Sequence, residues 1–155
     1  MKISFIKLLM LVVCFPVFFS SCWEDLPVYE DAEITKVGFY HRFAGSGTDV
    51  VTGEPIMVET ELTCQYEIDS EAATVYVDVT VPSANGDFTE AERNNVKLEN
   101  LWGYFNVSTA AKVTPINGSP TLGTPGDWSE PHEYEIMAAS GFKKTWTVTV
   151  RSFSK

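Results

Sequence analysis

Apolar and polar residues alternate along much of the chain after residue 33. Between residues 61 and 69, and again between 73 and 81, every second residue is apolar. A period of two is typical of β-strands that bury one face and expose the other. The intervening residues 69–72 include Asp and Ser, which favour turns. The two segments are therefore predicted to form a β-hairpin.

The C-terminal part of the chain shows the same pattern and predicts a second hairpin. Residues 133–138 and 145–151 alternate in polarity and are rich in β-branched and aromatic side chains, which pleated strands favour. Residues 139–142 supply the turn between them. Weaker strand signals are present at 34–43, 96–98, 104–107 and 112–116.

Signals for helices are scarce. Thr89 and Glu92 have the spacing of a capping box, which predicts one short turn of helix. Prolines and glycines make residues 115–131 a long loop. About seven to eight short strands of this kind predict an all-β fold, a single antiparallel immunoglobulin-like β-sandwich over residues 34–155.

The first 21 residues follow a different pattern. Lys2 and Lys7 precede an uncharged apolar run over residues 8–19, and two serines follow that run. As a helix the run would be about 18 Å long, whereas a membrane-spanning helix needs roughly 20 residues. Residues 1–21 are therefore predicted to be a removable signal peptide.

The residue that follows this segment is a cysteine. The sequence Phe-Ser-Ser at 19–21, together with Cys22, resembles a lipobox, in which an apolar residue and two small ones precede an acylated cysteine. Cys22 is therefore predicted to carry acyl chains that hold the protein to a membrane. The alternative is an ordinary secretory peptide followed by an incidental cysteine. Residues 22–33 are acidic and contain a proline, so they are expected to form a tether.

Net charge and cysteine content narrow the possible partners and the stabilising chemistry. The chain has a formal net charge of −10 at pH 7, which repels phosphate backbones and argues against nucleic acid as a partner. Cys14 would leave with the signal peptide and Cys22 would be acylated. Cys64 would then be alone in the domain, so the fold is expected to form without an intrachain disulfide.

The sequence offers few of the residues that catalysis or metal binding requires. Its two histidines, His41 and His132, belong to no motif for a nucleophilic triad, a zinc site or a phosphate loop. Most of the acidic residues lie on the solvated faces of predicted strands, where carboxylates are poorly tuned for acid–base chemistry. We therefore expect that the protein is not an enzyme and uses no cofactor or metal.

Aromatic residues are the remaining candidates for a binding site. Trp102 and Tyr104 cluster at the start of one predicted strand, and Trp128 lies in the long loop beside Asp127. Sugar rings stack their C–H faces on such side chains, while polar groups bind the hydroxyls. These four residues are the candidate ligand-binding residues. In the alternative interpretation, Trp102 and Trp128 fill the core or plug the loop, and Asp127 caps loop amides.

Four short motifs add a family resemblance to this interpretation. They are Gly-Asp-Trp at 126–128, Tyr-Glu-Ile at 134–136, Ser-Gly at 140–141 and Trp-Thr-Val-Thr-Val at 146–150. In this order they resemble a family of uncharacterised Bacteroidota surface lipoproteins with an immunoglobulin-like β-sandwich. The resemblance implies a lipid-anchored place in the outer membrane and an association with glycan-uptake systems. It implies no catalytic residue, and it leaves surface or periplasmic orientation open.

Two functions of different classes follow from these patterns. The first is a non-catalytic binding module. A lipid anchor would hold the module on the membrane, where it would help to capture a polysaccharide for an uptake system. The second is a structural or accessory subunit that docks onto a larger outer-membrane or fimbria-like assembly. Exposed strand edges, which pair readily with other chains, would serve the second function.

Overall fold

The computed structural model describes residues 28–155. The predicted signal peptide, Cys22 and the first part of the predicted tether lie outside the described residues. One α-helix, α2 (Glu90–Asn95), and one 3-10 helix, η2 (Leu98–Asn100), accompany the strands in this part of the chain. The strands are β1 (Ile34–Thr48), β2 (Pro55–Glu61), β3 (Thr63–Asp69), β4 (Thr74–Thr80), β5 (Leu101–Val107), β6 (Lys112–Ile116), β7 (Pro125–Gly126), β8 (His132–Met137) and β9 (Lys143–Ser154).

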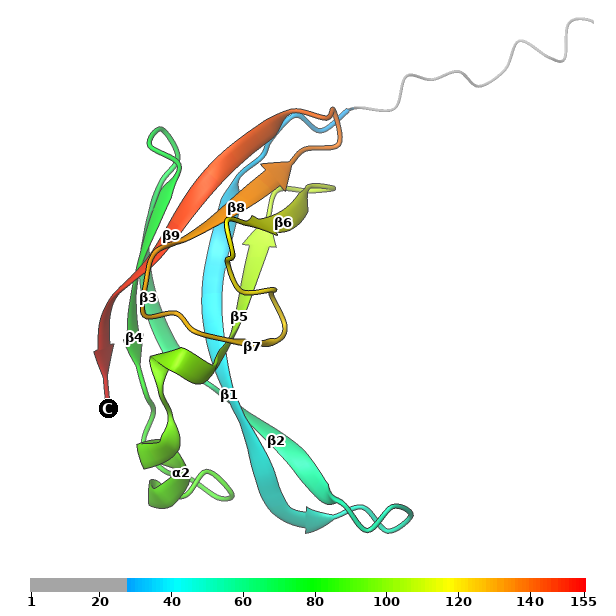
Figure 1. Ribbon diagram of the computed structural model, residues 1–155, viewed down its shortest axis with the longest axis vertical. Coiled ribbons are helices and arrows are strands. Elements are labelled where there is room, and N and C mark those ends of the chain that lie inside the picture. Colours follow the sequence, from blue (N-terminus) through cyan, green and yellow to red (C-terminus); the bar gives the residue numbers. More distant parts are fainter. Residues whose placement is uncertain (1–27) are drawn as a thin grey trace, which may run out of the picture.

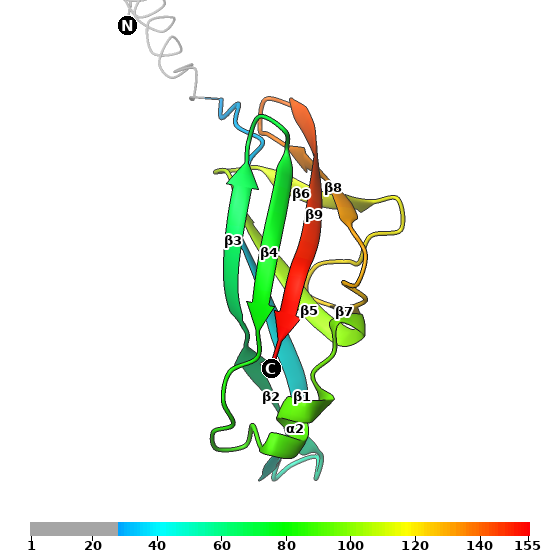
Figure 2. The ribbon, with the colours of Figure 1, turned by 90° about the vertical axis from the view of Figure 1, so that its left-hand side faces the viewer.

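These strands form two sheets that pack face to face, which confirms the predicted all-β sandwich. The four-stranded sheet has the order β2-β1-β5-β7, and the five-stranded sheet has the order β3-β4-β9-β8-β6. Figure 2 shows β3, β4 and β9 side by side in front of the other sheet. The chain passes from one sheet to the other between β2 and β3, where Leu62 N donates to Phe39 O at 2.9 Å.

One strand pair departs from the expected antiparallel arrangement. β4 and β9 pair in parallel, so the five-stranded sheet is mixed. The two strands belong to different predicted hairpins, and the alternation within each hairpin carries no information on how the hairpins pair. The immunoglobulin-like topology stays a prediction.

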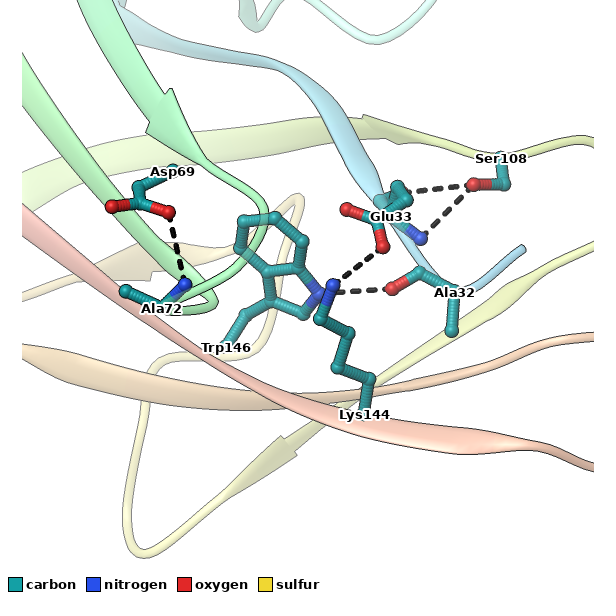
Figure 3. A network of polar contacts seen from close by, with 7 residues as sticks. All are labelled: Ala32, Glu33, Asp69, Ala72, Ser108, Lys144 and Trp146. Atoms are coloured by element: carbon teal, nitrogen blue, oxygen red, sulfur yellow. Dashed lines mark hydrogen bonds and ion pairs between the residues drawn. The ribbon is translucent and has the colours of Figure 1, made fainter.

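Both predicted hairpins are present. β3 and β4 pair antiparallel, with Tyr66 opposite Val77. The turn between them is closed by Asp69 Oδ1, which accepts from Ala72 N at 2.9 Å (Figure 3). β8 and β9 pair antiparallel around a turn in which Ala138 N donates to Phe142 O at 2.8 Å. Local alternation together with turn residues was therefore a sufficient signal for these elements.

Two segments differ from the sequence-based expectation, and a third agrees with it. The predicted strand at 96–98 is wrong, because Val96 ends α2 and η2 begins at Leu98. The strand β2 was not predicted before Glu61, since residues 56–58 are consecutively apolar rather than alternating. The short helix is confirmed, because the Thr89 side chain caps it by accepting from Glu92 N at 3.2 Å.

The core lies between the sheets and is built from the inward-facing residues of both. Trp146 and Trp128 are its largest side chains, and each indole Nε1 donates to a backbone carbonyl, at 2.9 Å to Ala32 O and at 3.1 Å to Leu101 O. Other fully buried residues are Ile34, Val37, Phe39, Val75, Val77, Val79, Val96, Tyr134 and Ile136. Cys64 is half-buried, and its burial raises the pKa of the thiol.

The last residues of the predicted tether are attached to the sandwich. Ala32 is buried, and Glu33 N donates to Ser108 Oγ at 3.0 Å (Figure 3). Lys144 of β9 pairs with the Glu33 carboxylate, and Ser140 N donates to Tyr29 O at 3.1 Å. The end of the predicted tether is therefore docked on the domain. Between residues 28 and 155, no helix is long and apolar enough to cross a membrane.

Candidate functional site: an aromatic strip on the four-stranded sheet

The outer face of the four-stranded sheet carries three aromatic side chains from two neighbouring strands. In β1, buried Phe39 alternates with half-buried Tyr40. Tyr40 lies opposite Trp102 of β5, and Tyr104 is two residues further along the same face of β5. We call Trp102, Tyr40 and Tyr104 the aromatic strip. Two of its three members were predicted from the sequence.

Tyr104 lies across the backbone of β1 at a glycine. Gly38 is its cross-strand partner, and a Cβ atom on Gly38 would lie 2.3 Å from Cε1, Cζ and Oη of the tyrosine. The ring therefore occupies space that the side chain of any other residue would fill. Lys36 Nζ lies 5.4 Å from the centroid of this ring. Tyr40 borders it, with 5.0 Å between the ring centroids.

The hydroxyl of Tyr104 is fixed by charged neighbours. It donates to Glu61 Oε1 at 2.8 Å, and Lys36 Nζ lies 3.8 Å from the same oxygen. Two effects raise the pKa of Tyr104 well above its usual value: desolvation by burial is the larger, and the hydrogen bond to Glu61 is the next. The phenol is protonated at neutral pH and so is able to donate this hydrogen bond.

Trp102, like Tyr104, lies beside a cation that is paired with a glutamate of β2. The Arg42 guanidinium lies 4.2 Å from the centroid of the indole. Arg42 Nε donates to Glu59 Oε2 at 2.9 Å, and a terminal nitrogen of the same guanidinium lies 2.8 Å from that oxygen. A guanidinium over an indole is a favourable cation–π contact. Because the arginine side chain is 42% exposed, a ligand has access to this pair from solvent.

Two depressions border the aromatic strip. The first has a volume of about 280 Å³ and the second of about 340 Å³. The first is lined by residues that include Lys36, Gly38, Glu61, Cys64, Tyr66 and Tyr104. The second is lined by Arg42, Met57, Val58, Glu59 and Trp102. Residues of β1, β2, β3 and β5 line the first depression, and residues of β1, β2 and β5 line the second.

Trp128, the third predicted ligand residue with an aromatic ring, is not part of this surface. It is 1% exposed, and its ring lies against Gly103 on the inner face of β5. Its ring centroid is 4.8 Å from that of Phe39. The prediction that Trp128 contacts a ligand is therefore wrong. The loop folds back over the edge of the sheet and inserts the indole into the core. The core-filling alternative is confirmed.

Asp127 is committed to its own loop. Its Oδ1 accepts from Ser129 N at 2.9 Å and from Ser129 Oγ at 2.6 Å. These two hydrogen bonds lower the pKa of the Asp127 carboxyl. The loop-capping role considered for Asp127 is therefore confirmed.

Sequence reasoning missed Tyr40, Arg42, Glu59 and Glu61. The first two are separated by one residue in the segment 34–43, so a period of two places them on the same face. The signal for Tyr40 and Arg42 was thus present. Glu59 and Glu61 could not be assigned, because strand β2 was not predicted and its register with β1 is a non-local property.

The histidines do not form a second site. His41 is 5% exposed and stacks on Phe43 in the core, with its Nε2 3.5 Å from a carboxylate oxygen of Glu92. His132 Nε2 lies 2.6 Å from Asp127 O. Among residues 28–155, no group of three or more histidine, cysteine or acidic side chains is arranged to hold a metal ion.

Replacing Gly38 with alanine is expected to lower the free energy of unfolding by about 1–3 kcal/mol, because the new methyl group overlaps the Tyr104 ring. Urea denaturation followed by circular dichroism measures the change. In a Tyr104→Ala background the same substitution should cost much less, since the obstructing ring is gone. Equal costs in both backgrounds would contradict the proposed seating of the ring.

Comparison with known proteins places this sandwich in a family. A family model described as DUF5018-related matches residues 34–149, which is most of the chain. The crystal structure of a candidate secreted protein from Bacteroides fragilis NCTC 9343 is 54% identical in sequence, with a TM-score of 0.77. That match covers 83% of this chain and 100% of the other chain. No protein with a curated description matches. The chain therefore belongs to the DUF5018-related family.

Proposed function

We propose that this protein is a non-catalytic binding module that captures glycan through the aromatic strip. The observation that carries the proposal is the Tyr104 ring, which lies against Gly38 on the outer face of the four-stranded sheet. Aromatic faces of this kind stack on the C–H faces of sugar rings, and nearby charged groups bind the hydroxyls. Trp102 and Tyr40 extend the surface on the same side of the sheet.

The proposed setting is the outer membrane, with the domain attached through a lipid on Cys22. The sequence of the first 22 residues supports this part of the proposal. A related protein from Bacteroides fragilis is described as a candidate secreted protein, which is consistent with export. Since only five residues separate Cys22 from Val28, such an anchor would hold the domain close to the membrane.

A binding role is favoured over hydrolysis by the state of the carboxylates beside the strip. Glu59 pairs with Arg42, and Glu61 pairs with Lys36 and accepts from Tyr104. The side chains of Glu59 and Glu61 are about half exposed, at 49% and 54%. Carboxylates that are open to solvent and already paired with cations are poorly suited to act as a general acid.

Affinity gel electrophoresis against a panel of polysaccharides tests the proposal. We expect at least one polysaccharide to retard the wild-type protein, and Tyr104→Ala or Trp102→Ala to weaken binding about tenfold, which corresponds to ~1.4 kcal/mol. Tyr76→Ala is the matched control, because Tyr76 is 40% exposed and lies beside Arg151 on the five-stranded sheet. The proposal fails if no polysaccharide retards the protein, or if the control weakens binding equally.

A second candidate function, docking onto a larger assembly, is favoured by the β1–β2 hairpin. This hairpin ends the molecule opposite the first described residues (Figure 1). Val50 and Val51 in its loop are 99% and 88% exposed, and Asp49 Oδ1 accepts from Val51 N at 2.8 Å and so helps to order the loop. Exposed apolar side chains on an ordered loop are typical of interaction sites. Two results together would favour docking. Crosslinking of intact cells would join this loop to another protein, and no polysaccharide would retard the protein in affinity gels.

A further inference from the structure

The charged groups along the aromatic strip are balanced one to one. We infer that the ligand is an uncharged polysaccharide, bound as an extended chain along β1, an inference that rests on the proposed glycan-binding function. Two cations, Arg42 and Lys36, lie on this surface, and each is paired with a carboxylate of β2. The four charges sum to zero on a chain whose formal net charge is −10.

The cations are poorly placed to receive an anionic sugar. Arg42 directs two of its nitrogens to Glu59 Oε2, and Lys36 lies 3.8 Å from Glu61 Oε1. A uronate or sulfate group that approached either cation would meet the paired carboxylate at the same place. Two like charges in contact repel, and breaking the existing pair would leave a carboxylate without its partner.

The same pairs are well suited to hydroxyl groups. A sugar hydroxyl donates one hydrogen bond and accepts others, so it matches a carboxylate beside a guanidinium or an ammonium. Glu61 Oε1 already accepts from Tyr104, which leaves Oε2 of the same carboxylate available. Glu59 Oε1 is likewise outside the contacts with Arg42, which both end on Oε2. The pairs therefore offer donors and acceptors without a net charge.

The length of the surface indicates a chain rather than a single sugar. Six residue steps separate Lys36 from Arg42, which corresponds to about 20 Å along an extended strand. Lys36 lines the first depression and Arg42 lines the second, with Tyr40 between them in sequence. One ring could contact only part of this surface. Several consecutive units are needed to contact Tyr104, Tyr40 and Trp102 together.

Isothermal titration of the purified domain with neutral and acidic polymers tests the inference. The neutral probes are a glucan, a mannan and a galactan, and the acidic probes are polygalacturonate and chondroitin sulfate. We expect binding to at least one neutral probe, less than a twofold change between 0.05 and about 0.5 M NaCl because no net charge is neutralised, and at least tenfold tighter binding of a hexasaccharide than of its monosaccharide. Salt-sensitive binding to an acidic probe, lost in Trp102→Ala, would overturn the inference and leave the proposed function intact. Absence of binding to both groups of probes would remove both.

A charge variant tests the role of the ion pairs directly. Glu59→Gln together with Glu61→Gln frees Arg42 and Lys36 and removes two negative charges, while glutamine keeps an acceptor at each position. We expect affinity for polygalacturonate to rise at least fivefold at low salt and to return to the wild-type level at about 0.5 M NaCl. Glu67→Gln with Glu71→Gln is the matched control, because it removes the same charge near the turn between β3 and β4. An equal rise in the control, or none in the test variant, would overturn the inference.

Discussion

Replacing Trp146 with alanine is expected to lower the free energy of unfolding by about 3–5 kcal/mol. The indole is fully buried between the sheets, and its Nε1 donates to Ala32 O at 2.9 Å. Truncation would leave a large cavity and a buried carbonyl without its donor (Figure 3). Since domains of this size are stable by about 5–15 kcal/mol, the variant loses a large part of its stability. Urea denaturation followed by circular dichroism measures the change.

Two further variants separate packing from hydrogen bonding. Trp146→Phe keeps most of the buried ring but leaves Ala32 O without a partner, so it should cost about 1–3 kcal/mol. Trp102→Ala is the control for tryptophan loss on the outer face, and it should cost clearly less than Trp146→Ala. If Trp146→Ala were no more destabilising than Trp102→Ala, the assignment of Trp146 to the core would be wrong.

The same contact connects the core to the N-terminal segment. Ala32 and Glu33 precede β1, and Glu33 pairs with Lys144 of β9. Lys144 Nζ lies 4.8 Å from the centroid of the Trp146 ring, so the ion pair and the indole form one cluster (Figure 3). Loss of Trp146 is therefore expected to release this segment first, seen as faster amide exchange at Glu33 and Ile34.

The elements that sequence analysis predicted well are those specified by local signals. The hairpins β3–β4 and β8–β9 combine a period of two with turn residues, and their strands are adjacent in the chain. The pairing of β1 with β5 joins residues more than 60 positions apart, as in Tyr40 opposite Trp102. Nothing in either segment specifies that register. The same limit applies to the parallel pairing of β4 with β9.

The candidate site was predictable to a similar extent. Trp102 and Tyr104 are two residues apart, so a strand places them on the same face, but assembly of the sheets decides whether that face is outward. For Trp128 the prediction was wrong: because it lies in a loop rich in proline and glycine, its side chain was expected to be exposed to a ligand. The loop instead returns along β5, where Trp128 N donates to Leu98 O at 2.9 Å and the ring enters the core.

The space for that ring depends on Gly103, and replacing Gly103 with alanine is expected to lower the free energy of unfolding by about 3 kcal/mol. A Cβ atom there would lie 2.2 Å from Cζ2 and 2.7 Å from Cη2 of Trp128. The indole has no room to yield, because it is 1% exposed and packs edge-on against Phe39. At Gly38 the overlap is similar, but Tyr104 lies on the outer face and could turn into solvent by giving up its hydrogen bond to Glu61. Gly103→Ala should therefore cost more than Gly38→Ala.

Urea denaturation of three variants decides whether the overlap with Trp128 is the cause. Gly47→Ala is the matched control: its Cβ would lie 3.2 Å from the Cδ1 end of the Ile56 side chain, which is able to move, so it should cost less than about 1 kcal/mol. Trp128→Phe provides a smaller ring, so combining it with Gly103→Ala should cost less than the two separate losses added together. Strict additivity, or a cost for Gly103→Ala no greater than that for Gly47→Ala, would show that the close approach of β5 to Trp128 does not constrain the core. A subadditive result would instead identify the missing side chain at residue 103 as the feature that allows a loop tryptophan to fill the sandwich, leaving Trp102 and Tyr104 of the same strand on the outer face.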